Sequence, residues 1–136
     1  MRLLVSILIA LFFYIRMDIL IWQRIFETNQ LWQYAGVYHR GWYMSLYGFI
    51  LLGVLLLPTW REKLFYGITL LILCFNGTND ILYYWLDGRA LPERLEWLDG
   101  HVLILFSPVT SGTLLLNCAL WIVAILVLYF LQWRWT

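Results

Sequence analysis

No charged side chain occurs between His101 and Arg134, a stretch longer than one membrane crossing requires. A helix needs about 20 predominantly apolar residues to cross a hydrocarbon core about 30 Å thick. A soluble domain has little room for such a run, because its surface helices bury one apolar stripe and keep the opposite face polar. This stretch therefore indicates a membrane segment, and it constrains the fold more than any other feature of the chain.

The rest of the chain has the same character. Of its 136 residues, 63% are hydrophobic and 12% are charged, whereas soluble domains average roughly 45–50% and about 25%. Four crossings would use most of this length and leave little for a soluble domain. We therefore predict an all-α fold in a single domain, residues 1–136: an integral membrane bundle of four transmembrane helices.

Charge and cysteine content exclude several classes of function. The net charge is +1, and no run of Lys and Arg is long enough to follow a phosphate backbone, so nucleic-acid binding is not predicted. Cys74 and Cys118 lie far apart in apolar stretches without CxxC spacing, which argues against a metal site or a disulfide framework. No motif for a cofactor is present either.

The ends of the predicted crossings follow from helix breakers and caps. Pro58 ends the second segment, because its ring and missing N–H terminate a helix. Ser107 and Pro108 suit a cap and a first helical position, so we expect the fourth to begin there. Arg2 and the following apolar run resemble a secretory signal, yet no small-x-small cleavage site follows, so we expect an uncleaved helix. The predicted spans are residues 3–22, 41–57, 64–86 and 108–131.

Two connections are long enough to carry structure. In the third connection Leu91, Leu95 and Leu98 recur at helical spacing, which predicts a short interfacial helix. A second short helix is expected near residues 31–34.

Two features near the fourth span need separate interpretation. Residues 101–106 consist of His101 and five apolar residues, and we expect them to lie at the interface or to dip into it. Several Trp and Tyr residues flank the apolar runs, as interfacial aromatic residues do: Trp22, Trp42, Tyr43, Trp60, Tyr84, Trp85, Trp133 and Trp135. Trp121 is the exception and should face lipid or another helix.

The distribution of basic residues gives a preference for one orientation. Each side of the predicted bundle has four basic residues, but Arg2, Arg61, Lys63 and Arg134 lie in the shorter segments, close to helix ends, where the positive-inside rule acts most strongly. We therefore expect both termini in the cytoplasm, in a plasma or inner membrane whose lipids surround the protein.

The depth of the polar residues is the most informative feature for function. Asp18 and Asp80 lie near the ends of two parallel spans, roughly 6 and 9 Å below the same membrane surface at 1.5 Å per residue. Arg16 is slightly deeper. Charged groups at such depth generally face the bundle interior or a water-filled cavity. The sequence therefore predicts a polar cup that opens toward the long connections, whereas the other half of the bundle is almost wholly apolar.

The third span would supply most of the cup. Its polar residues follow three- and four-residue spacing and form one broad stripe on a continuous helix: Asn76, Asn79, Asp80, Tyr83, Tyr84 and Asp87. Gly77 would let a neighbouring backbone approach closely. His39 and His101 lie at loop ends on the same side and are further candidates for ligand binding.

Each candidate has a structural interpretation beside the functional one. Arg16 with Asp18 or Asp80 fits either a catalytic pair or an ion pair that fixes helix register. Asn76 and Asn79 could bind a ligand, but interhelical asparagine hydrogen bonds also hold bundles together. Histidines at helix ends commonly make only surface hydrogen bonds, so we predict no metal site.

Three functions fit these features. In the first, a lipid-like molecule places its polar end in the cup, where Asp18 and Asp80 transfer protons, Arg16 stabilises charge, and the other polar residues orient the ligand. Isomerisation, hydration or hydrolysis of an isoprenoid or acyl compound would suit such groups. The second is an accessory subunit of a larger membrane complex, and the third is a proton-coupled transporter that acts as a homo-oligomer.

Overall fold

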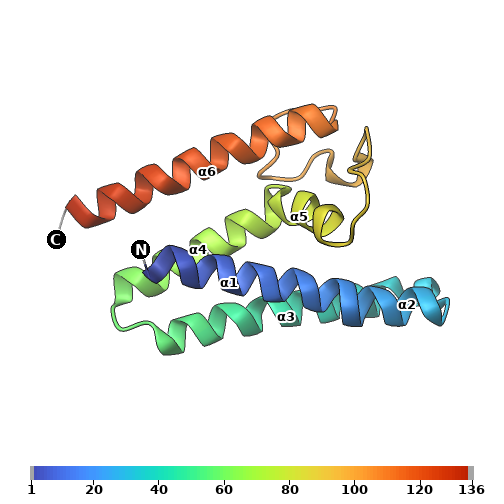
Figure 1. Ribbon diagram of the computed structural model, residues 1–136, viewed down its shortest axis with the longest axis horizontal. Helices are drawn as coiled ribbons and strands as arrows, with labels where there is room; N and C mark the ends of the chain where they lie inside the picture. Colours follow the sequence, from blue (N-terminus) through green and yellow to red (C-terminus); the bar gives the residue numbers. More distant parts are fainter. Residues whose placement is uncertain (1, 135–136) are drawn as a thin grey trace.

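The computed structural model describes residues 2–134, which form helices and no sheet, as predicted (Figure 1). The first and last described residues lie at one end of the molecule, together with the turn between α3 and α4. The two long connections lie at the opposite end. The molecule thus has a short-turn end and a long-connection end.

The first helix is longer than the predicted span of residues 3–22. It runs without interruption through α1 (Arg2–Met17), a π-helical turn η1 (Asp18–Gln23) and α2 (Arg24–Thr28). Its polar last turns remain helical because their side chains pair along the helix: Gln23 Nε2 donates to Glu27 Oε1 at 2.6 Å. The prediction ended too early because it equated the end of the apolar run with the end of the helix.

The second helix also begins earlier than predicted. A 3₁₀ turn, η2 (Leu31–Tyr34), lies where the short helix was expected, and α3 (Ala35–Leu56) follows it directly. The chain reverses at Gln30, which has a left-handed φ of 53°. At the other end α3 stops just before Pro58, which confirms the proline stop.

The predicted third span is not one helix. It consists of α4 (Trp60–Phe75) and α5 (Thr78–Leu86), whose axes are bent by 69°. At the break the Oδ1 atom of Asn76 accepts a hydrogen bond from the Thr78 N–H at 2.9 Å, and Gly77 has a φ of 92°. An asparagine that binds a nearby backbone N–H competes with the helix, and glycine adopts the left-handed conformation without a Cβ penalty. The break therefore has a local cause.

The last helix, α6 (Ser111–Arg134), begins after the predicted Pro108. Residues 109–111 instead hydrogen-bond to the preceding connection: the Leu95 N–H donates to the Val109 carbonyl at 2.9 Å, and the Ser111 N–H to the Glu93 carbonyl at 3.1 Å. Thr110 and Thr113 then cap the helix through reciprocal side-chain bonds to each other's N–H. Tertiary pairing thus overrides the serine–proline start signal.

In the third connection the predicted short helix is reduced to one 3₁₀ turn, η3 (Glu96–Leu98). Leu95 and Leu98 are buried against Val109, Leu114 and Cys118. The leucines at helical spacing therefore pack inside the protein.

Two helices are long and apolar enough to cross a membrane, residues 2–28 and 111–131, and the bent pair α4 and α5 adds a third if it counts as one span. These helices mark a multi-pass membrane protein. The helix α3 is not among them, because its first turns carry His39 and Arg40. Four crossings therefore remain a prediction.

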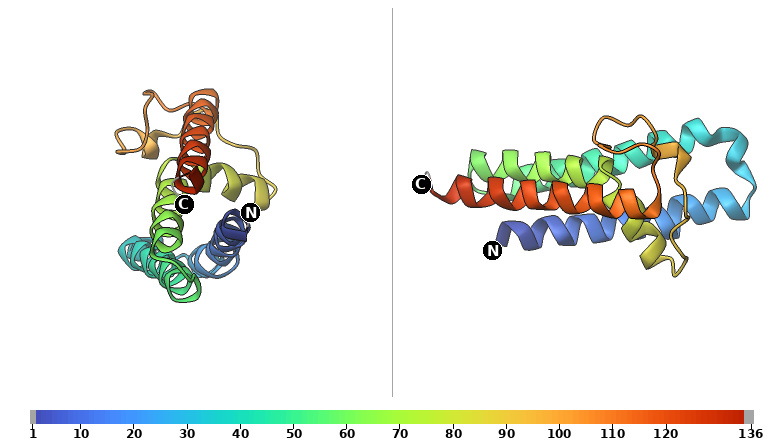
Figure 2. Two further views of the ribbon diagram at one scale, coloured as in Figure 1. Left: turned by 90° about the vertical axis from the view of Figure 1, so that its left-hand side faces the viewer. Right: turned by 90° about the horizontal axis from the view of Figure 1, so that it is seen from above.

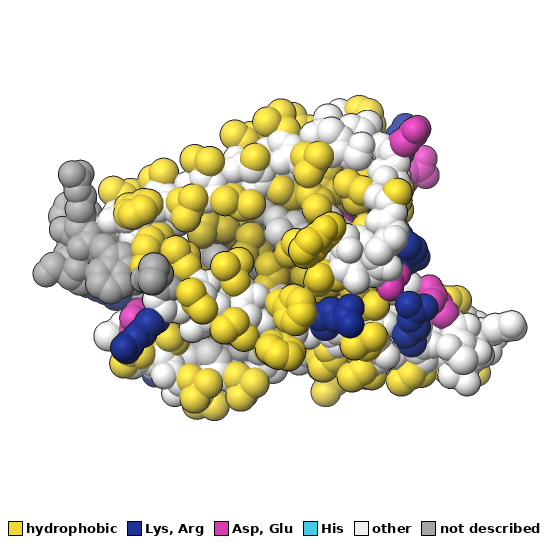
Figure 3. All heavy atoms as spheres, viewed as in Figure 1, with side chains coloured by type: hydrophobic (Ala, Val, Ile, Leu, Met, Phe, Trp, Pro, Cys, Tyr) yellow, Lys and Arg dark blue, Asp and Glu magenta, His cyan; other side chains and the backbone are white. Residues whose placement is uncertain are grey.

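The helices α1, α3 and α4 pack around a shared core, and α6 lies against α4 on the other side (Figure 2). Close packing of α3 on α4 depends on Gly53, which lies against the ring of Tyr66, whose hydroxyl donates to the Phe49 carbonyl at 3.0 Å. Hydrophobic side chains cover much of the face in Figure 3, with charged ones mainly toward its ends. This surface suits a lipid environment.

Candidate functional site

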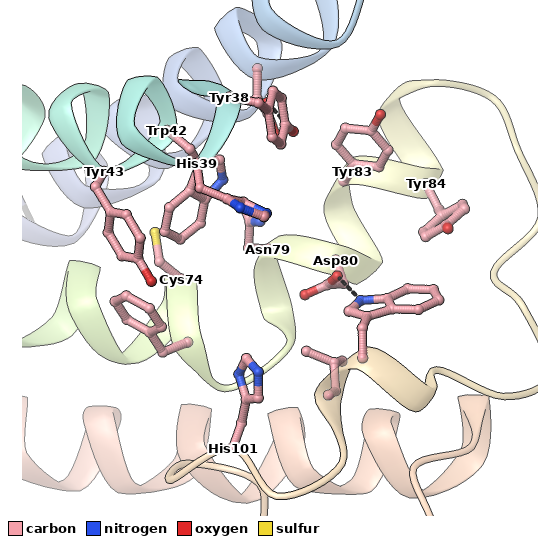
Figure 4. A pocket seen from close by; sticks show the side chains of 14 residues that line it. Tyr38, His39, Trp42, Tyr43, Cys74, Asn79, Asp80, Tyr83, Tyr84 and His101 are labelled. Carbon is pink, nitrogen blue, oxygen red and sulfur yellow. Dashed lines mark hydrogen bonds between the residues drawn. The ribbon is translucent and has the colours of Figure 1, made fainter. Parts of the chain in front are cut away.

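A cavity of about 570 Å³ lies toward the long-connection end, where η1, α3, α5 and η3 converge (Figure 4). We call this cavity the cup. Its lining combines acidic, aromatic and histidine side chains: Asp18, Tyr38, His39, Trp42, Tyr43, Cys74, Phe75, Asn79, Asp80, Tyr83, Tyr84, Trp97, Leu98 and His101.

Asp18 enters the cup from the π-helical turn, of which it is the first residue. Only 4% of its surface is exposed, and the Tyr38 hydroxyl donates to its Oδ1 atom at 2.6 Å. A π-turn widens the helix by one residue per hydrogen-bonded ring, and such turns occur frequently at functional sites. The local backbone therefore aims a buried carboxyl group at the cup.

Asp80 enters from the first turns of α5, where the Trp97 indole N–H donates to its Oδ1 atom at 3.0 Å (Figure 4). The depth comparison predicted that Asp18 and Asp80 share a level, and the structure places both in one cavity.

Five further predicted residues line the cup: Asn79, Tyr83, Tyr84, His39 and His101. The two histidines approach from opposite sides, His39 from α3 and His101 from the connection after η3 (Figure 4). Asn79 is buried, with 8% of its surface exposed, and within residues 2–134 its Oδ1 atom has no hydrogen-bond partner. This amide oxygen is therefore an unsatisfied acceptor enclosed in the wall of the cup.

Arg16 does not join the two acids. Its Nη1 atom donates to the Leu86 carbonyl at 3.4 Å, and among the described residues it forms no ion pair with either Asp18 or Asp80. Residues two apart on a helix point about 200° apart, so Arg16 and Asp18 cannot present their side chains on one face. Arg16 therefore forms neither the expected catalytic pair nor the expected structural ion pair with Asp18 or Asp80.

Asn76 and Asp87 also lie outside the cup lining. Asn76 is fully buried at the helix break, which separates it from the rest of the predicted stripe. Asp87 pairs with Arg89 at 2.6 Å and with Arg24 at 3.2 Å, and it ties the end of α5 to α2. Both residues have structural partners.

Sequence reasoning missed half of the lining. Tyr38 and Trp42 come from the turns of α3 that precede or begin the predicted span, and Trp97 comes from a connection expected to lie on the surface. The only signal for them was the density of aromatic residues near the cup side. Cys74, which is buried, also lines the cup.

Asn117 of α6, which the sequence analysis also missed, holds the region around the cup together. Its Nδ2 atom donates to the carbonyls of Asn76 at 2.7 Å and Leu103 at 3.2 Å, and its Oδ1 atom accepts from the Leu105 N–H at 2.9 Å. Trp121 donates to the Leu103 carbonyl at 2.8 Å, instead of facing only lipid or another helix. Irregular backbone at membrane depth is tolerated where protein groups satisfy it, and these side chains do so for the Leu103 carbonyl and the Leu105 N–H.

Asp99 fixes the turn that carries Trp97. It accepts hydrogen bonds from the Val109 N–H at 2.9 Å and from the Ser107 hydroxyl at 3.3 Å, and it pairs with Arg94 at 3.5 Å. The Val109 N–H chiefly, with Ser107 and Arg94, holds the pKa of Asp99 below its usual range. The position of Trp97 thus depends on an ionised anchor outside the membrane segments.

The charge of the cup lining is one-sided. Among the described residues, no Lys or Arg lines it. The Arg89 guanidinium lies 5.5 Å from the centre of the Tyr83 ring, which lines the cup, and is paired with Asp87. Within residues 2–134 no group of three His, Cys, Asp or Glu side chains is placed to hold a metal ion.

An apolar groove of about 680 Å³ adjoins the cup. It shares three lining residues with the cup, Tyr43, Phe75 and His101, and continues along α4 over Leu71, Ile72 and Ile68. Residues 100–103 form its other wall. A polar cavity and an apolar groove therefore meet at one boundary.

Comparisons of the chain with protein-family models, with curated proteins and with solved structures give no match. The geometry itself offers two carboxyl groups, two histidines, an unsatisfied amide oxygen and an aromatic wall in one cavity. These groups can accept hydrogen bonds and exchange protons with a bound molecule.

Proposed function

We propose that this protein binds a lipid-like molecule of the isoprenoid or acyl class in the cup and acts on it by acid–base chemistry. The observation that carries the proposal is the shared boundary of the cup and the apolar groove at Tyr43, Phe75 and His101. A molecule that spans this boundary must have one polar and one apolar end. Small-molecule sites commonly combine an apolar wall with a few placed polar groups.

The groove has room for a long hydrocarbon tail. Ile68 and Ile72 also line a second apolar hollow of about 380 Å³ between α4 and α6, which reaches Arg61. From Phe75 to Arg61 the α4 helix rises about 21 Å, at 1.5 Å per residue. This length exceeds half of a hydrocarbon core about 30 Å thick, so the track suits a chain as long as one lipid leaflet.

In the cup, Asp18 and Asp80 would carry the proton transfers. Both carboxyl groups have an aromatic donor that fixes one oxygen, Tyr38 for Asp18 and Trp97 for Asp80, and leaves the other oxygen for a ligand. Asn79, Tyr83 and Tyr84 would orient the polar end. Isomerisation, hydration or hydrolysis remains the class of reaction that such groups support.

The four-crossing topology, with both termini in the cytoplasm, belongs to the same proposal. It is supported by the position of both chain ends at the short-turn end of the molecule, since an even number of crossings returns the chain to its starting side. The second crossing would be α3. The cup would then open toward the side of the membrane opposite the termini.

The test is native mass spectrometry of the protein purified in mild detergent, with extraction of any retained small molecule. We expect a specific retained compound that Asp80→Asn loses. Glu93→Gln serves as the matched control, because Glu93 is an exposed acid outside the cup. A wild-type protein that retains only bulk lipid, in the same amounts as Asp80→Asn, would count against the proposal.

A second candidate is an accessory subunit of a larger membrane complex, or a homo-oligomer. The outer face of α6 favours it, because this helix packs on α4 and leaves a long apolar surface exposed: Leu115, Leu116, Leu120, Val123, Val127 and Phe130. Co-purification of one stable partner protein, without a retained small molecule, would support this alternative.

A further inference from the structure

We infer that the polar end of the ligand is a protonated amine, so that the cup binds a cationic amphiphile. This inference rests on the proposed function and names the head group of its ligand. It depends on three observations: the sign of the charges that line the cup, an unsatisfied acceptor within it, and the aromatic rings around it.

The first observation is the charge. Asp18 and Asp80 enter the same cavity, and among residues 2–134 no Lys or Arg lines it. A phosphate or carboxylate head would meet two acidic groups there without a lysine or arginine to pair with, which is unfavourable away from water. A cationic head would instead offset the cost of keeping carboxylates in a poorly hydrated cavity.

The second observation is the hydrogen-bonding balance. Asn79 Oδ1 is buried and unpartnered within the described residues, and each aspartate retains an oxygen that its aromatic donor does not occupy. All three groups are acceptors, so they need a ligand that donates. An ammonium group has only donors, whereas a carboxylate or phosphate has only acceptors.

The third observation is the aromatic wall. Six Trp and Tyr side chains line the cup in addition to the acids: Tyr38, Trp42, Tyr43, Tyr83, Tyr84 and Trp97. The face of an aromatic ring attracts a cation, and cages of such rings recognise ammonium groups. Arg89, with its guanidinium 5.3 Å from the centre of the Tyr84 ring, shows this attraction at the outer side of the wall.

The experiment compares three probes with the same 12-carbon tail: dodecylamine, 1-dodecanol and dodecanoate. Their binding to the purified protein in lipid nanodiscs is measured by isothermal titration calorimetry at neutral pH. We expect the amine to bind about tenfold more tightly than the alcohol or better, as a charge-assisted bond does relative to a neutral one, and the carboxylate to bind most weakly. Asp80→Asn should remove most of the preference for the amine, and Asp80→Glu should keep it.

The outcomes separate this inference from the proposed function. Alcohol or carboxylate binding as tight as amine binding would overturn the inference and leave the lipid site standing. Specific binding of none of the probes would overturn both. A preference for the amine that survives unchanged in Asp80→Asn and Asp18→Asn would mean nonspecific attraction and would also overturn it. Glu93→Gln, which removes an exposed acid outside the cup, controls for net charge.

Discussion

Replacing Asn117 with leucine keeps the branched shape of the side chain but removes the polar atoms that join α6 to the helix break and to residues 103–105. Asn117 is 1% exposed, and three of its hydrogen bonds are lost. The Leu103 carbonyl keeps a partner, because Trp121 also donates to it at 2.8 Å. The cost therefore falls mainly on two backbone groups, the Asn76 carbonyl and the Leu105 N–H.

The size of the effect follows from these two groups. Leaving a buried polar group unsatisfied costs about 1–3 kcal/mol, whereas single interhelical hydrogen bonds in a membrane average about 0.6 kcal/mol. The Asn76 carbonyl keeps a weak contact with the Cys118 thiol at 3.5 Å, so its loss is incomplete. We expect Asn117→Leu to lower the free energy of unfolding by about 1–3 kcal/mol.

The assay is reversible unfolding in mixed detergent and SDS micelles, with hydrogen exchange measured at residues 103–106. Trp121→Phe is the matched control, because it removes one donor from the Leu103 carbonyl while Asn117 still satisfies that group. We expect the control to lose less than about 1 kcal/mol. Wild-type stability in Asn117→Leu, with unchanged exchange at Leu105, would refute the role assigned to this residue.

Three further results are expected. Ile68→Trp should fill the groove and weaken retention of a long-chain ligand at least about tenfold in the mass-spectrometric assay. Leu55→Trp, on the exposed face of α3, should leave retention unchanged. Equal retention by the two variants would contradict the groove as the site of the ligand's tail. Gly77→Ala should destabilise the protein by about 1–3 kcal/mol, more than Gly88→Ala. Of these two glycines, only Gly77 would bring the added Cβ against a side chain of α6, that of Leu114. Equal losses of unfolding free energy in the two variants would argue against this packing. The pKa of Asp99 is lowered in the folded protein, so its stabilising effect is present at neutral pH and is lost as the pH falls below about 4. The difference in unfolding free energy between wild type and Asp99→Asn should therefore shrink in that range. A constant difference would contradict the role of Asp99 in holding the turn that carries Trp97.

The elements that were predicted well are those set by local chemistry. Pro58 ends α3 where expected, because no tertiary contact can restore a missing N–H. The apolar run that forms α6 is helical for the same kind of reason, since backbone groups in lipid must be satisfied within the helix. Asp18 and Asp80, which the depth comparison placed at one level, do line one cavity, although that comparison assumed a straight third span and α5 is bent by 69° from α4.

The elements that were missed depend on contacts between distant segments. The break at Asn76 and Gly77 had a visible signal in the glycine, but the spacing of polar residues through it also fitted a continuous helix. The late start of α6 requires the pairing of Val109 with Leu95, which no local rule indicates. Trp97 reaches Asp80 only because its connection folds back over the cup.

Arg16 illustrates the limit of a depth argument. Depth placed it near both acids, but the angle around the helix decides which side chains meet, and Arg16 points toward the end of α5 instead. Roles for residues in a bundle therefore need both the depth and the angular position of each side chain.

The central claim is that the cup and the groove hold one amphiphilic molecule. The most direct test is an experimental structure of the protein purified without exchange of its native lipids. We predict continuous density that begins between Asp80 and Asn79, passes His101 and Phe75, and follows α4 past Ile68. A cup that holds only water, with separate lipid density confined to the groove, would contradict the claim.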